Sequence, residues 1–159
     1  MGVVYALADT CVLADIICQY DPRNPHKLLS EGKNLRKDML KIVNTIVEDE
    51  EENGYIVAST FAFVELINRF DACFTGLITI ERLMSIMNQP PSWLIIENIN
   101  IDTSQCFCDV PNSIDGENVS SDDSVHVATA LQRGDNIFFL TTDHILSKMD
   151  LPRITFINT

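Results

Sequence analysis

The chain has 159 residues, which suits a single domain, residues 1–159, that buries roughly two-thirds of the surface of its unfolded chain. Hydrophobic residues make up 46% of the chain and charged residues 21%, close to the globular average, and no apolar run approaches the roughly 18 residues that a membrane span needs. The formal net charge of −12 argues against broad electrostatic attraction to nucleic acid, although six of the eleven Lys and Arg residues lie between positions 23 and 41.

The first predicted element is a buried strand, Val3–Ala8, a continuous apolar run with β-branched residues. This run is too short for a signal peptide and no Lys or Arg precedes it, so we expect a cytoplasmic protein. Asp9 and Thr10 follow the strand, and Cys11–Cys18 has helical spacing. Asp9 is therefore expected at the carboxyl end of a buried strand, which is the edge of an open α/β sheet where ligands bind.

The middle of the chain alternates between predicted helices and short apolar strands. A loop is expected at Tyr20–Gly32, and Asn53-Gly54 is expected to end the helix that follows it. Ser59 or Thr60 is a predicted helix N-cap. The predicted elements of this part are the helices Lys33–Glu52, Phe61–Ala72 and Gly76–Asn88 and the strands Tyr55–Ala58 and Trp93–Ile96.

The last third of the chain continues the alternation of helices and strands. Its predicted elements are a short helix at Asp102–Asp109, a loop at Pro111–Val119, a helix at Asp122–Arg133, a strand at Ile137–Thr141, a helical turn at His144–Met149 and a strand at Ile154–Ile157. Strands that are too apolar for an exposed face predict a parallel sheet covered on both sides. The predicted fold class is α/β, a three-layer α/β/α domain with a central, mostly parallel sheet of four to five strands.

Four carboxylates stand where this fold would bring them together. Asp9 and Asp143 each follow a strand, Asp123 begins the helix before the fourth strand, and Glu65 lies in an apolar helix. Two unit charges about 4 Å apart repel by about 4 kcal/mol at an effective dielectric constant of about 20, and a divalent cation removes this cost. Oxygen ligands suit Mg²⁺ or Mn²⁺. Alternatively, Arg69 pairs with Glu65 on the helix surface.

Four segments resemble, in order, the four motifs of PIN domains, and most of all those of VapC-type ribonuclease toxins. They are Asp9–Leu13 (DTCVL), Phe63–Ile67 (FVELI), Asp123–Ala130 (DSVHVATA) and Thr141–Asp143 (TTD). The resemblance extends from Val3 to about Met149, and its most distinctive part is the third motif.

The resemblance implies a metal-dependent endoribonuclease that hydrolyses RNA phosphodiester bonds. In such an enzyme, four catalytic and metal-binding acids surround one or two Mg²⁺ or Mn²⁺ ions. Two threonines support these acids, and an arginine contacts phosphate. The acids are Asp9, Glu65, Asp123 and Asp143, the threonines are Thr10 and Thr142, and the arginine is Arg69.

The resemblance further implies the toxin of a type II toxin–antitoxin pair, inhibited by a cognate antitoxin protein and assembled as a homodimer with no membrane partner. Two alternatives remain open: a PIN-fold nuclease of RNA processing or quality control without an antitoxin, and a non-catalytic PIN-like binding module. The length of the polar region Asp21–Glu52 and the isoelectric point near 4.4 depart from the family pattern. Phosphoryl-transfer hydrolases are disfavoured, because the Asp-x-Asp pair and a Gly-rich phosphate loop are missing.

Four other residues have plainer interpretations. Asp123 takes the family's position by its distance from Ala128 and Ala130, which leaves Asp122 to cap the helix or face solvent. His126 is predicted to be a packed, hydrogen-bonded residue of the core or groove. Cys106 and Cys108 lack the spacing of a zinc site, and five cysteines do not suggest a disulfide framework.

Overall fold

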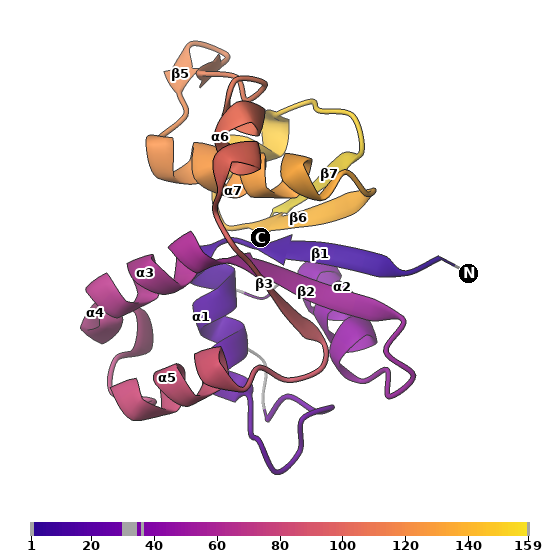
Figure 1. Cartoon of the computed structure of the whole chain (residues 1–159), viewed down its shortest axis with the longest axis vertical. Helices are drawn as coiled ribbons and strands as arrows, with labels where there is room; N and C mark the ends of the chain where they lie inside the picture. The colour runs from indigo at the N-terminus through magenta and orange to yellow at the C-terminus, as the bar shows by residue number, and fades with distance from the viewer. Residues whose placement is uncertain (1, 30–34, 36, 159) are drawn as a thin grey trace.

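The computed structural model describes residues 2–29, 35 and 37–158, and it is built on a parallel sheet of five strands in the order β3-β2-β1-β6-β7 (Figure 1). Part of the predicted loop at Tyr20–Gly32 and the start of the helix predicted from Lys33 lie outside the described residues. The predicted α/β class and strand number are confirmed. The strands of the sheet are β1 (Val4–Ala8), β2 (Gly54–Ser59), β3 (Leu94–Glu97), β6 (Ile137–Thr141) and β7 (Ile154–Asn158).

The strand order reverses direction beside β1. From β1 the chain adds β2 and then β3 on one side, and it later returns to place β6 and β7 on the other side. Strand β1 pairs in parallel with both β2 and β6, so the carboxyl ends of β1 and β6 are adjacent. Such a reversal opens a crevice at the carboxyl edge, because the chains leaving the two strands go to opposite faces of the sheet.

Helices cover both faces of this sheet, in agreement with the predicted three layers. Alternate side chains of β1 enter two separate cores: Ala6 and Ala8 pack on one face and Leu7 packs on the other. In Figure 1, α1 and α2 lie on one side of the sheet, and α6 and α7 lie on the other. The helices are α1 (Thr10–Gln19), α2 (Lys37–Val47), α3 (Thr60–Asn68), α4 (Phe70–Phe74), α5 (Ile80–Asn88), α6 (Ile101–Phe107), α7 (Ser121–Arg133) and the 3₁₀ turn η1 (Leu146–Lys148). No helix among the described residues is long and apolar enough to cross a bilayer.

Helix α2 ends earlier than predicted. The prediction placed its end at Glu52 with Asn53-Gly54 as the cap, but the last helical residue is Val47. Five acidic residues follow, and negative charge is unfavourable at the negative end of a helix dipole. Instead, the Asp49 carboxylate accepts hydrogen bonds from the backbone N–H groups of Glu51 and Asn53, which forms a turn into β2.

The predicted helix Phe61–Ala72 is wrong as one element, because it divides at Arg69. Arg69 leaves the helical region, with φ −115° and ψ 34°, and separates α3 from α4. After this change of direction Phe74 is fully buried, with its ring 5.0 Å from that of Phe70. The next helix begins at Ile80 rather than Gly76, because Thr75 and Gly76 adopt left-handed conformations.

The predicted loop Pro111–Val119 contains a small antiparallel hairpin. Its strands are β4 (Ser113–Ile114) and β5 (Glu117–Asn118). Asp115 and Gly116 form the turn between them, with φ angles of 51° and 81°. Asp-Gly is a favoured pair for such turns, because both positions need positive φ.

Candidate active site

One cavity at the carboxyl edge of the sheet collects all the residues that the sequence singled out for catalysis. It has a volume of about 290 Å³ and lies beside the reversal in strand order. The predicted residues that line it are Asp9, Thr10, Glu65, Arg69, Asp123, Thr142 and Asp143. The four acids come from four separate segments, so the predicted convergence on one place is what the fold produces.

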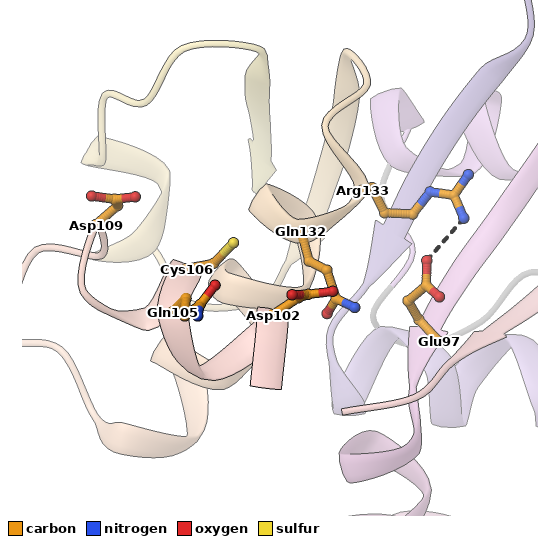
Figure 2. Close-up of a pocket in the computed structure, with 7 residues that line it drawn as sticks. All are labelled: Glu97, Asp102, Gln105, Cys106, Asp109, Gln132 and Arg133. Atoms are coloured by element: carbon orange, nitrogen blue, oxygen red, sulfur yellow. Dashed lines mark hydrogen bonds and ion pairs between the residues drawn. The ribbon is translucent and has the colours of Figure 1, made fainter. Parts of the chain in front are cut away.

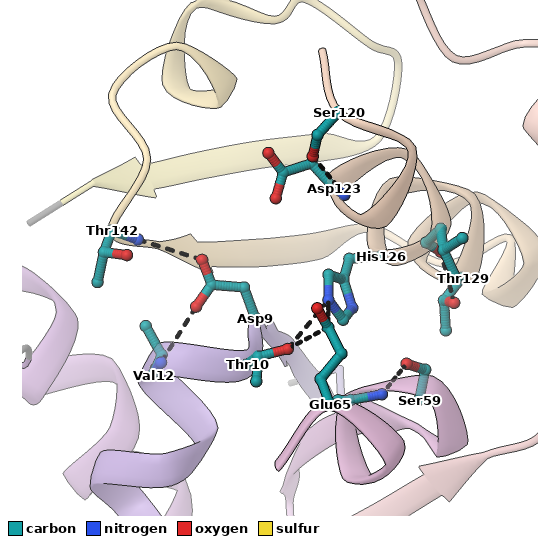
Figure 3. Close-up of polar contacts among 12 residues, drawn as sticks. Asp9, Thr10, Val12, Ser59, Glu65, Ser120, Asp123, His126, Thr129 and Thr142 are labelled. Atoms are coloured by element: carbon teal, nitrogen blue, oxygen red, sulfur yellow. Dashed lines mark hydrogen bonds and ion pairs between the residues drawn. The ribbon is translucent and has the colours of Figure 1, made fainter. Parts of the chain in front are cut away.

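Asp9 is held rigidly between two elements. It is 7% exposed, its Oδ1 accepts a hydrogen bond from the Val12 N–H at 3.1 Å, and its Oδ2 accepts one from the Thr142 N–H at 3.2 Å (Figure 3). The first bond caps α1 and the second ties α1 to the end of β6. Burial raises the pKa of Asp9 above its usual value, and the hydroxyl of Thr141 and the N–H of Val12 partly oppose this rise.

Glu65 lies at the centre of a three-residue contact. The Thr10 hydroxyl donates to Glu65 Oε1 at 2.5 Å, and His126 Nε2 lies 2.8 Å from the same oxygen. Burial opposes ionisation of Glu65, but the hydrogen bonds from His126 and Thr10 outweigh it and lower the pKa of Glu65 below its usual value. The side-chain partner of Glu65 is thus His126, and not Arg69 as in the alternative of a pair on the helix surface.

Asp123 lies on the opposite side of the cavity from Glu65. The Ser120 hydroxyl caps α7 by accepting the Asp123 N–H at 3.1 Å, so the cap predicted for Asp122 is wrong and the solvent position is confirmed. Burial raises the pKa of Asp123, and a contact with the Asp143 carboxyl raises it further. Asp143 is held by the Ile145 N–H at 2.8 Å. The carboxyl groups of these two acids therefore lie close together.

Arg69 is the cationic residue that lines the cavity. It is exposed at the junction of α3 and α4, on the same helix edge as Glu65. A guanidinium that reaches the mouth of an acidic cavity can contact a phosphate without neutralising the acids inside.

The four carboxylates have some, but not all, of the features of a cation site. Their oxygen donors are the type that Mg²⁺ and Mn²⁺ prefer, and burial, which raises the pKa of Asp9 and of Asp123, makes their charged forms costly unless a positive charge lies nearby. Among the described residues, however, no three His, Cys, Asp or Glu side chains are placed so that they could hold a metal ion together. The donor chemistry fits such a cation, and Figure 3 shows Asp123 on α7, across from Asp9 and Glu65.

A larger cavity, of about 580 Å³, lies elsewhere and contains none of the predicted site residues (Figure 2). Arg133 donates to Glu97 at 2.9 Å, and its guanidinium lies 4.5 Å from the centre of the Tyr5 ring. Arg133, the arginine that lines this cavity, is therefore paired with Glu97. Its lining residues are Glu97, Asp102, Gln105, Cys106, Asp109, Gln132 and Arg133.

The strand order and the helices on both faces define a three-layer α/β/α protein with a PIN-like fold. Solved structures share this fold. One is a chain of VapBC2 from Rickettsia felis bound to a DNA fragment from their promoter, with a TM-score of 0.59, 13% identity, and coverage of 98% of this chain and 99% of that chain. Another is a chain of DNA-bound VapBC from Salmonella typhimurium, with a TM-score of 0.54, 16% identity and 98% coverage of both chains. No protein-family model and no curated protein matches this chain.

Two contacts in the site were not assigned from the sequence. His126 was predicted to be packed and hydrogen-bonded, which is confirmed, but nothing indicated that its partner is Glu65. Thr141 was quoted only as part of a motif, yet its hydroxyl accepts the Asp143 N–H at 2.9 Å and also contacts Asp9. Its position at the buried end of a strand, before Asp143, was the sequence feature that could have predicted these contacts.

We expect Asp123→Asn to be more stable than the wild-type chain at neutral pH. Because the pKa of Asp123 is raised on folding, the folded state binds the proton more tightly, and stability falls as pH rises from the unfolded-state pKa through the folded-state pKa. Asn avoids this loss, so the difference in unfolding midpoint should shrink as pH is lowered towards the ordinary Asp range. Asp38→Asn, at an exposed first-turn position of α2 outside the cavity, is the control and should change stability by less than about 0.5 kcal/mol. A destabilised Asp123→Asn would contradict the assignment of unfavourable burial.

Proposed function

We propose that the protein is a metal-dependent endoribonuclease and the toxin of a toxin–antitoxin pair. The observation that carries this proposal is the meeting of Asp9, Glu65, Asp123 and Asp143 in one cavity at the switch point of the sheet. A protein that only binds a partner has no need to hold four acids together, since their mutual repulsion destabilises the folded chain.

When bound, Mg²⁺ or Mn²⁺ supplies an activated water and a Lewis acid for in-line attack on a phosphodiester. Asp9 and Glu65 are already oriented by hydrogen bonds from separate elements, so they provide the fixed side of the site. Asp123 and Asp143 would provide the other side of the site. Thr10 and Thr142 hold the fixed acids through a hydroxyl and a backbone N–H.

The proposed partner is a small antitoxin protein. Two solved structures that share the fold over nearly the whole chain are of VapBC assemblies. The strongly acidic composition of this chain is compatible with a basic antitoxin segment that covers the acidic cavity.

The proposal is tested with metal-free protein and a mixture of transfer and ribosomal RNA. We expect cleavage after addition of Mn²⁺ or Mg²⁺, none in EDTA, and recovery when the metal is returned in excess. A rise in melting temperature with millimolar Mn²⁺ would report binding independently of cleavage. If the protein shows no cleavage and no shift in melting temperature, a non-catalytic binding module is favoured instead.

Arg69→Ala is expected to weaken RNA binding without affecting folding. Its side chain is exposed, so the loss of one phosphate contact corresponds to about 1 kcal/mol, or a rise in KM of up to roughly fivefold. The rise should diminish at high salt, because salt screens the contact. Lys148→Ala removes an exposed positive charge that does not line the cavity and is the control. An unchanged KM for Arg69→Ala would show that this residue does not contact RNA.

A further inference from the structure

We propose that His126 is a positioning residue that holds the carboxylate of Glu65 in place for a cation. This inference rests on the proposed function and adds a residue to its site. His126 lies in the second turn of α7, on one side of the sheet, whereas Glu65 belongs to α3 on the other side. The contact therefore joins the two helix layers at the carboxyl edge (Figure 3).

The hydrogen bonds specify the orientation of the imidazole ring. A carboxylate can only accept, so the proton of a neutral His126 is on Nε2, which lies 2.8 Å from Glu65 Oε1. Nε2 also lies 3.2 Å from the Thr10 hydroxyl oxygen, and that hydroxyl donates its own proton to Glu65 Oε1. Two donors from two helices therefore meet one carboxylate oxygen, and the other oxygen of Glu65 can bind a cation.

Ordinary core packing does not explain this histidine. The residue is 2% exposed and its ring centre lies 5.7 Å from that of Phe61, surroundings that would suit an apolar side chain. Its Nδ1 atom is buried and has no hydrogen-bond partner among the described residues. A buried polar atom without a partner destabilises the folded state, so His126 is not the side chain that stability alone would select. Its contact with Glu65 accounts for the choice.

Two substitutions separate positioning from packing. His126→Leu fills the space without a donor, whereas His126→Gln places an amide N–H near the position of Nε2. Thr129→Val is the matched control, because Thr129 is equally buried on the same helix and its hydroxyl donates only to the backbone carbonyl of Val125. Each full-length variant is prepared metal-free, its unfolding midpoint is measured, and its affinity for Mn²⁺ is determined by calorimetry.

His126→Leu is expected to bind Mn²⁺ about 10- to 100-fold more weakly than the wild-type chain, as for loss of a hydrogen bond to a metal ligand. His126→Gln should recover most of this affinity, and Thr129→Val should retain it. In RNA cleavage, His126→Leu should lower kcat and leave KM unchanged. If folded His126→Leu binds Mn²⁺ as tightly as the wild-type chain, the positioning role of His126 is wrong, whereas the proposed function is unaffected.

A measurement on the unmodified chain covers the case in which His126→Leu does not fold. Nitrogen-15 spectra of the metal-free protein should show the tautomer of His126 that carries its proton on Nε2, and a proton on Nδ1 would overturn the inference. If the wild-type chain neither binds Mn²⁺ nor cleaves RNA, the proposed function fails, and the role of His126 fails with it. The two kinds of failure are therefore distinguishable.

Discussion

Asp9→Asn is expected to lower RNA cleavage by at least about a hundredfold while the chain stays folded. Changes at groups that only support a metal ligand cost about 10- to 100-fold, so removal of a ligand charge should cost at least the upper value. Asn still offers an oxygen to the Val12 N–H, and Asn is as good a helix cap as Asp. The kcat of the variant on RNA, measured in saturating Mn²⁺, checks the expectation.

Two opposing effects determine the stability of the Asp9→Asn variant. In Asp9→Asn an amide NH₂ replaces the oxygen that accepts from Thr142, which costs about 1 kcal/mol. The substitution also removes a buried charge whose pKa is raised by burial, and this offsets the loss. Asp38→Asn, an exposed change of the same charge on α2, should leave cleavage unchanged. If Asp9→Asn cleaves RNA with the kcat of the wild-type chain, Asp9 is not a catalytic residue.

Phe63→Ala is expected to destabilise the protein by about 3–5 kcal/mol. Phe63 is fully buried and is one of the largest side chains in the core beneath α3, the helix that carries Glu65. The substitution removes packing and leaves a cavity, and the loss is large beside the roughly 5–15 kcal/mol that stabilises a typical domain. Urea unfolding followed by circular dichroism measures it.

Val64 provides the matched control for Phe63. It is the next residue on the same helix but is 59% exposed, so Val64→Ala should change stability by less than about 0.5 kcal/mol. Similar losses for the two variants would mean that α3 packs through a different face.

The sequence predicts the scaffold of the site well, because buried strands and the acids that follow them have local signatures. Val3–Ala8 and Ile137–Thr141 are apolar runs, and both are strands of the sheet. Once the sheet is parallel, the acids that follow adjacent strands must share an edge. Asp9 and Asp143 could therefore be placed near each other without any knowledge of side-chain contacts.

The features that the sequence did not predict depend on contacts across the chain or on conflicting local signals. The end of α2 at Val47 reflects charge against the helix dipole, which a count of apolar positions ignores. The hairpin at Asp115-Gly116 has a local signal, but its strands have only two residues each. The bond from His126 to Glu65 joins residues 61 positions apart, and only the packed structure brings them together.

The central position of β1 determines when the site can form. The bond from the Thr142 N–H to Asp9 spans 133 positions, and β6, the neighbour of β1, is the fourth strand of the sheet to be synthesised. A growing chain that has not yet reached residue 143 thus lacks one acid and the backbone clamp on another. Since domains are made at about 5–20 residues per second, this order delays assembly by roughly 7 to 27 seconds after β1 is synthesised. Under the proposed function, a chain still on the ribosome is an incomplete nuclease, and an antitoxin needs to act only on the finished protein.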